Sequence, residues 1–317
     1  MDVALIPPSS VPIAMPVIPG WALPSGPVTN PAEAAFLAGA ALNSLDNLVR
    51  SNPPWAGVWR ARLALSCAAA AARHAGRTED EAALRDAWML RPADGDPGPA
   101  GRLLATWRRL AERSPMMDAT TLESTCGLLG LSWRPELIAL PDEIDRYLRE
   151  GRAAPLFAAA VLRAVDKTAP NAGLLGWWLA DQVLARRLRW PLPLPLLMAE
   201  AHSAAFRGTG RGGRLRPGDD GFEAALCLAV AQGAARACRV AAEIAPRAAR
   251  LLAVAPKLRA KGAGEAIALL LDDDAVPGTL ATAKLSRWGA RRLFERLEAL
   301  GAVRELTGRS AFRLYGL

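Results

Sequence analysis

The residues best suited to binding chemistry fall in a short segment near the C-terminal end, 286–301. Placed on a helix, this segment divides into two faces. The apolar face holds Ala290, Leu293, Leu297 and Leu300. The opposite face presents Trp288, Arg291, Arg292 and Glu295, flanked by Arg287 and Arg296. Guanidinium groups suit phosphates and the guanine edge, and an α-helix fits the major groove. The pattern therefore predicts a helix that contacts double-stranded DNA.

Residues on both sides of this segment extend the predicted contact. Ser286 is placed to cap the helix and Gly301 to end it. Lys284 precedes the helix, where a backbone phosphate would lie, and Arg309 and Arg313 would reach an adjacent groove from a hairpin. A solvated arginine face, or a face that binds protein, stays open as the alternative, because Trp288 and Glu295 suit either.

A second group of arginines surrounds a glycine-rich loop that follows His202. Its members are Arg207, Arg211, Arg214 and Arg216. His202 resembles the general base of a phosphate-binding nest that would also contain Gly208, Gly210, Arg211 and Arg214. The spacing also fits a flexible Arg/Gly loop, or one that widens a DNA-binding surface. We expect a phosphate contact here rather than catalysis.

Metal and cofactor chemistry is not expected. The four cysteines form no C-x-x-C pair, and the chain has only two histidines, so no set of zinc ligands is proposed. His74 lies in an alanine-rich helix and is interpreted as a packed or half-exposed residue. Asp272–Asp274 is interpreted as a solvated helix end rather than a cation site. Trp177 and Trp178 are expected in a core or a subunit interface.

Helical periodicity runs through most of the chain. Hydrophobic residues make up 51% and aromatic residues 6% of the sequence, which favours helices over a β-sandwich. We expect an all-α fold with helices that include 31–50, 58–76 and a long one from 222 to about 255, kinked near Pro246. Thr78 and Asp118 are predicted caps. No series of strands is expected before residue 302.

The last fifty-five residues predict a winged-helix domain. Amphipathic stretches over 262–274, 279–285 and 287–300 suggest three helices, and alternating residues around Gly308 suggest a β-hairpin. From Arg247 onward, the sequence contains thirteen lysines and arginines and seven acidic residues. This surplus of basic residues accounts for most of the net charge of +8. This asymmetry marks the end of the chain as a separate functional unit.

Three parts are expected along the chain. Residues 1–30 form a proline-rich arm, 31–255 a helical body and 256–317 the winged helix. The start of the sequence lacks the basic region of a secretory signal. The apolar run over 174–185 is too short to span a bilayer and contains Asp181. We expect no membrane association and a cytoplasmic location.

Five phrases resemble a bacterial family catalogued as domain of unknown function 1403. They are AGAALNSLDNLV…PPWAGVWRARLAL, GRTEDEAALRDAW, WWLADQVLARRLRWPLPLPLLM, PKLRAKGAGEAIALLLDDDAVP and LSRWGARRLFERL. They run from about residue 32 to the end, and the resemblance itself implies no activity.

The order of elements also resembles that of Fic proteins that carry a C-terminal winged helix. The resemblance rests on SLDNLVR (44–50), 173–197 and 218–245. That resemblance implies an all-helical fold and a nucleotidyl-transfer loop of the form H-P-F-x-D/E-G-N-G-R-x-x-R. The corresponding positions run from Asp166 through Asn171 to Gly173, with no histidine, metal-binding acid or phosphate arginine. The Fic-type site is therefore expected to be degenerate.

The leading prediction is a DNA-binding protein of regulatory or mobile-element/plasmid-associated type. Its non-catalytic body would support homodimerisation, sensing or a protein partner. Two alternatives remain open. One is a Fic-like enzyme that transfers a nucleotidyl or phosphate group to protein through Asp166 or His202, and the other is a protein–protein adaptor.

Overall fold

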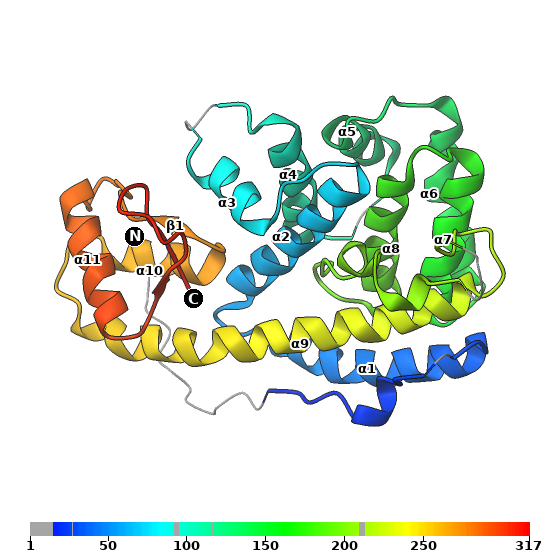
Figure 1. Cartoon of the computed structure of the whole chain (residues 1–317), viewed down its shortest axis with the longest axis horizontal. Helices are drawn as coiled ribbons and strands as arrows, with labels where there is room; N and C mark the ends of the chain where they lie inside the picture. The colour runs from blue at the N-terminus through cyan, green and yellow to red at the C-terminus, as the bar shows by residue number, and fades with distance from the viewer. Residues whose placement is uncertain (1–14, 27, 92–94, 116, 209–212) are drawn as a thin grey trace.

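The structure is a computed structural model that describes residues 15–26, 28–91, 95–115, 117–208 and 213–317. It is mostly helical, as expected, with a small sheet near the C-terminal end (Figure 1). The helices are α1 Pro31–Ser51, α2 Ala56–His74, α3 Glu81–Met89, α4 Gly98–Glu112, α5 Ala119–Leu129, α6 Leu140–Arg149, α7 Ala154–Thr168, α8 Gly173–Leu188, α9 Phe222–Val254, α10 Ala263–Asp272 and α11 Arg287–Ala299. Short 3-10 turns are η1 Gly20–Ala22, η2 Pro135–Ala139, η3 Met198–Glu200, η4 Ala204–Phe206 and η5 Ala255–Lys257.

The long helix α9 organises the body. It lies alongside α1, and α2 to α8 pack above this pair (Figure 1). The indole Nε1 of Trp59 on α2 donates a hydrogen bond to the carbonyl oxygen of Ala237 on α9 (2.9 Å). Trp177 and Trp178 are buried, which confirms their predicted place in the core. Burial of this apolar surface from several helices is the main stabilising force.

Helix α9 continues through Pro246, where the sequence suggested a kink. Proline removes one backbone donor, but the segment remains helical from Phe222 to Val254. By length and composition α9 with η5 could cross a membrane, yet 72% of its most apolar window is buried inside the protein. This burial is consistent with the core helix of a soluble protein.

Several helix ends follow the predicted capping residues. The Asp118 carboxylate accepts the backbone N–H of Thr121 at the start of α5 (2.7 Å). The prediction of Thr78 as a cap is wrong, because α3 begins later, at Glu81. Asp80 caps it instead and accepts the N–H of Ala83 (2.8 Å). Both Thr and Asp can cap a helix, so sequence alone did not separate these neighbouring positions.

The described part of the proline-rich segment, residues 15–26 and 28–30, contains no α-helix and lies against the body. The hydroxyl of Ser44 on α1 donates to the carbonyl oxygen of Val17 (3.4 Å). Trp21 stacks on Phe36 of α1, with ring centroids 5.7 Å apart. The first fourteen residues of the predicted arm lie outside the described part.

A helix–strand–helix–strand–strand unit closes the chain. Its strands are β1 Val276–Pro277, β2 Arg304–Glu305 and β3 Leu314–Gly316, in the sheet order β1-β3-β2. Both pairs are antiparallel, with Val276 opposite Tyr315 and Glu305 opposite the same tyrosine. The hairpin of β2 and β3 confirms the one predicted around Gly308.

One expectation for this unit is wrong, because the helix expected over 279–285 does not form. The two-residue strand β1 precedes this segment. The N–H of Gly278 donates to the carbonyl oxygen of Arg313 (2.8 Å), which extends the pairing with the last strand. Thr282 and Leu285 then exchange backbone hydrogen bonds (2.9 and 3.3 Å), so the chain forms a turn in place of the helical ladder.

Candidate nucleic-acid interface

Helix α11 is built as the sequence predicts. The Ser286 hydroxyl accepts the N–H of Gly289 (3.2 Å) at its start, and Gly301 takes a positive φ of 63° just past its end. Ala290, Leu293 and Leu297 are buried. Leu300 is 43% exposed, so its assignment to the packing face is wrong. It lies at the end of the helix, beyond the surface that the sheet covers.

An additional aromatic residue, Phe294, fixes α11 on the sheet. Its ring stacks on that of Tyr315 in β3, with centroids 4.9 Å apart and planes 4° from parallel. Both side chains are buried. This contact determines which face of α11 is turned inward, and therefore which face is left to solvent.

The outward face carries the predicted basic residues. Its exposed members are Arg287, Trp288, Arg291, Arg292 and Arg296. Arg291 pairs with Glu295 one turn along (3.0 Å), and both side chains are largely exposed. Within the described residues, no ion pair joins Arg287, Arg292 or Arg296 to an acid. Figure 1 places α11 at one end of the molecule, the end toward which the C-terminal part of α9 extends.

The turn before α11 presents one more basic residue. Lys284 is exposed, and its backbone N–H donates to the Thr282 hydroxyl (3.3 Å). Lys284 thus precedes α11 as predicted, but it lies on a turn instead of the end of a second helix.

An acidic side chain shapes the hairpin turn. The arginines of the hairpin have more partners within the protein than the arginines on the outward face of α11. The Glu305 carboxylate accepts the N–H groups of Thr307 (2.8 Å) and Gly308 (2.6 Å), which shapes the turn. Arg309 forms an ion pair with Asp86 of α3. The Arg313 guanidinium donates from Nε to the carbonyl oxygen of Arg309 (3.0 Å). These contacts give both hairpin arginines partners within the protein.

Sequence reasoning missed Phe312, at the hairpin. Its side chain is 70% exposed and its φ is 54°, in the left-handed region that β-carbon sterics disfavour. A large aromatic residue within a run of small and charged hairpin residues is the signal that marks it in the sequence.

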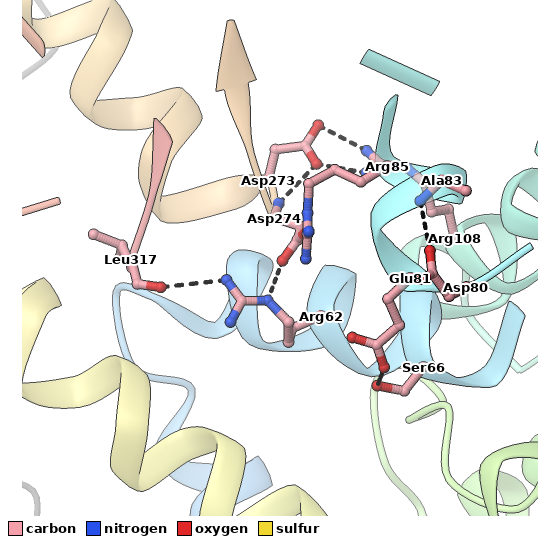
Figure 2. Close-up of polar contacts among 10 residues, drawn as sticks. All are labelled: Arg62, Ser66, Asp80, Glu81, Ala83, Arg85, Arg108, Asp273, Asp274 and Leu317. Atoms are coloured by element: carbon pink, nitrogen blue, oxygen red, sulfur yellow. Dashed lines mark hydrogen bonds and ion pairs between the residues drawn. The ribbon is translucent and has the colours of Figure 1, made fainter. Parts of the chain in front are cut away.

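A network of ion pairs joins this unit to the body (Figure 2). Asp274, which follows α10, is 3% exposed and pairs with Arg62 of α2 and Arg85 of α3. The neighbouring Asp273 pairs with Arg108 of α4 (2.6 Å). Arg62 also donates to the carbonyl oxygen of Leu317 (3.2 Å). The interpretation of Asp272–Asp274 as a solvated helix end is therefore wrong for Asp273 and Asp274.

The electrostatics of this network follow from its burial. Burial alone would raise the pKa of Asp274, but the guanidinium groups of Arg62 and Arg85 outweigh it and hold that pKa below its ordinary value. Asp274 is therefore a carboxylate that neutralises two arginines, and those two arginines are not free for a polyanion.

Comparison with known proteins gives one match. A family described as a protein of unknown function, DUF1403, matches residues 9–317. The chain belongs to the DUF1403 family. No curated protein matches it. The comparisons do not support the resemblance of this DUF1403 chain to Fic proteins.

The loop corresponding to the degenerate Fic site joins α7 to α8. Asp166 is half-buried in the last turn of α7, Asn171 is exposed, and Gly173 is the first residue of α8. A β-carbon added at Gly173 would lie 3.4 Å from Nε2 of His74. Among the described residues of this DUF1403 chain, no group of three or more His, Cys, Asp or Glu side chains is placed to hold a metal ion.

In the loop that contains Arg207, Arg214 and Arg216, only part of the guanidinium groups is available to a ligand. Arg207 and Arg214 face each other in an isolated β-bridge, and Arg216 is exposed. Arg214 donates to the carbonyl oxygens of Ala201 (2.8 Å) and Ser203 (3.1 Å), so part of its guanidinium is used within the loop. The predicted contact at Arg211 lies outside the described residues.

Proposed function

We propose that this chain binds double-stranded DNA through the outward face of α11. The observation that carries the proposal is that this face presents Arg287, Arg292 and Arg296 without an acidic partner in the described part of the chain. The helix has its apolar side fixed on the sheet by Phe294, so the arginines cannot turn inward without breaking that packing.

The arrangement of the C-terminal unit supports this function. We interpret the order α10, β1, α11, β2, β3, with the sheet order β1-β3-β2, as resembling a winged helix without a middle helix. In such a unit, α11 is the helix that enters the major groove. Lys284 and Ser286, which precede it, are close enough to the helix start to contact a backbone phosphate.

The hairpin contributes less than α11 in this proposal. Arg309 is paired with Asp86, and Glu298 and Glu305 lie near Arg313. We assign the hairpin a supporting contact to the DNA backbone through Arg313, and we assign the main contact to α11. Arg207, Arg214 and Arg216 belong to the body, on a separate loop.

The body acts in this proposal as a rigid support in a cytoplasmic DNA-binding protein of regulatory or mobile-element type. The ion pairs of Asp273 and Asp274 fix the DNA-binding unit on α2, α3 and α4. Homodimerisation or a protein partner would place two such units on one duplex, as symmetric DNA-binding proteins do. No cofactor or metal is part of the proposal.

A mobility-shift experiment with random-sequence duplex at low and moderate salt tests the proposal. We expect the double variant Arg292→Ala with Arg296→Ala to bind DNA at least about ten-fold more weakly. The slope of log binding constant against log salt concentration should decrease in magnitude by about two, because each phosphate contact releases counterions. The pair Arg291→Ala with Arg292→Ala should also weaken binding. Its effect should be smaller, because Arg291 is partly neutralised by Glu295.

The matched control removes the same charge from the body. Arg134 and Arg149 are exposed, and the variant Arg134→Ala with Arg149→Ala should bind as the wild type does. Equal binding by the wild type and the α11 variants would contradict the proposal. Absence of any shift by the wild type, together with nuclease-resistant capture of a protein, would identify the adaptor alternative instead.

A further inference from the structure

The only two histidines of the chain lie next to each other, although they are far apart in the sequence. His74 is the last residue of α2, and His202 lies between η3 and η4. Their ring centroids are 5.7 Å apart, and the rings are tilted by 49°. The first residue of α8, Gly173, meets Nε2 of His74 from a third segment. Three segments therefore converge on one pair of imidazoles.

The charged groups that face this pair are all basic. Burial lowers the pKa of His74, and Arg214 lowers it further. Burial also lowers the pKa of His202, and Arg214, His74 and Arg73 add to the effect. Within the described residues, no carboxylate is among the groups that shift either imidazole. A site with this balance of charge favours an anion.

Two polar atoms of the adjacent residues His202 and Ser203 lack partners. Nε2 of His202 and the hydroxyl of Ser203 are buried and make no hydrogen bond to any described residue. Buried polar atoms are ordinarily hydrogen-bonded, so an unpaired nitrogen and an adjacent unpaired hydroxyl indicate a missing partner. The N-terminus of α8 also has no side-chain cap, and Gly173 leaves that end uncovered by a side chain.

We propose that His74, His202, Ser203 and Arg214 form a binding site for a phosphate group, at the N-terminal end of α8. The imidazole nitrogens and the serine hydroxyl supply hydrogen bonds, and the part of the Arg214 guanidinium that does not bond to Ala201 and Ser203 supplies charge. The helix N-terminus adds its dipole. This site lies in the body and does not depend on the DNA-binding proposal.

Phosphate fits this set of groups better than a metal ion does. Two histidines can ligate a transition metal, but Arg214 and Arg73 would repel a cation, and no acid completes the ligand set within the described chain. A tetrahedral phosphate offers several acceptor oxygens to donors that converge from three segments. The source of the phosphate group is either the free anion or a nucleotide.

Histidine NMR tests the proposal directly on the full-length wild-type protein. Two side-chain resonances are expected, one from each histidine, and His74→Gln assigns them. We expect inorganic phosphate to shift both resonances saturably and to raise both imidazole pKa values by about one unit, because a bound anion favours the charged ring. Sodium chloride at matched ionic strength should leave both resonances in place. A nucleoside monophosphate that saturates at lower concentration would identify a nucleotide as the source.

Variants separate the site from a general charge effect. Arg214→Gln should abolish the phosphate response, and Arg216→Gln, which changes a nearby exposed arginine, should preserve it. Arg214→Gln also removes the hydrogen bonds that Arg214 donates to loop carbonyl oxygens. Gly173→Glu therefore provides a second test, which leaves Arg214 in place. Its carboxylate is expected to occupy the anion position, raise the pKa of His74 and remove the response. Histidine resonances of the wild type that respond equally to chloride and phosphate, or to neither, would overturn the proposal.

Discussion

Two buried aspartates show how environment decides the chemistry of one residue type. Asp181 on α8 accepts the N–H groups of Leu196 and Leu197 (both 3.1 Å) and forms no ion pair with any residue that the structure describes. Burial raises its pKa to about 7, although these hydrogen bonds and the nearby Arg236 favour the charged form. Asp274 is buried to a similar degree, but its two guanidinium partners lower its pKa. Only the paired carboxylate is held in its charged form throughout the ordinary pH range.

The raised pKa of Asp181 predicts a stability change with pH. The folded state holds this proton more tightly than the unfolded state, whose Asp pKa is near 3.8. The stabilisation from Asp181 is therefore complete below about pH 4 and is lost as the pH rises through about 7. Asp181→Asn cannot titrate, so its free energy of unfolding should decrease less than that of the wild type across this window. Urea unfolding at a series of pH values measures the difference.

The control for Asp181 is an aspartate that is exposed to solvent. Asp142 is exposed at the start of α6, and Asp142→Asn should retain the pH profile of the wild type. If Asp181→Asn and the wild type showed parallel profiles between about pH 4 and 7, the raised pKa would be refuted.

At the scale of single elements, local features were predictable and remote pairings were not. The caps at Asp118 and Ser286 and the end at Gly301 involve neighbouring residues, and the sequence predicted all three. Strand β1 forms through the pairing of Val276 with Tyr315 in the last strand, and the segment 279–285 beyond it contains a turn in place of the expected helix. Local periodicity carries no information about a partner so distant in the chain.

The candidate site divides in the same way. The exposed basic face of α11 followed from helical spacing, because one helix determines which of its residues share a side. The partners of Asp274 and Arg309 lie on α2 and α3, and no pattern in the sequence connects them to the C-terminal unit. Likewise, no pattern in the sequence connected the two histidines, and only the folded chain brings His74 to His202.

The attachment of the C-terminal unit gives a prediction at this scale. Asp274→Asn leaves Arg62 and Arg85 buried without their carboxylate, and loss of one partner from a buried ion pair costs about 3–5 kcal/mol. We expect lower stability in urea and faster hydrogen exchange in residues 262–317. Because the pKa of Asp274 is lowered, the wild-type network stabilises the protein above the unfolded pKa near 3.8 and weakens as the pH falls below it.

A glutamate in the same unit provides the control for Asp274. Glu265 on α10 is half-buried and has no ion-pair partner among the described residues, so Glu265→Gln should change stability and exchange only slightly. Similar stability for Asp274→Asn and Glu265→Gln would show that the network does not hold the unit on the body.

At the scale of the whole molecule, the body and the C-terminal unit are connected at several points. Helix α9 runs along the length of the protein toward the end where α11 lies (Figure 1). Arg250, near the C-terminal end of α9, donates to the carbonyl oxygen of Gly301 (3.2 Å), and α10 packs on α2. The pair between Arg309 and Asp86 adds a contact at the hairpin. The proposed DNA-binding face is therefore presented in a fixed orientation, with one hairpin arginine held by the body.

The pair between Arg309 and Asp86 predicts that the body limits DNA binding by the hairpin. Asp86→Asn removes the carboxylate that competes with phosphate for Arg309, so we expect two- to five-fold tighter binding to random duplex at low salt, within the ~1 kcal/mol typical of an exposed pair. The gain should shrink at moderate salt, where screening weakens both contacts. Asp142→Asn makes the same change of net charge away from the unit and should show no comparable gain. If the double variant Asp86→Asn with Arg309→Ala bound as tightly as Asp86→Asn alone, Arg309 would not be the residue released.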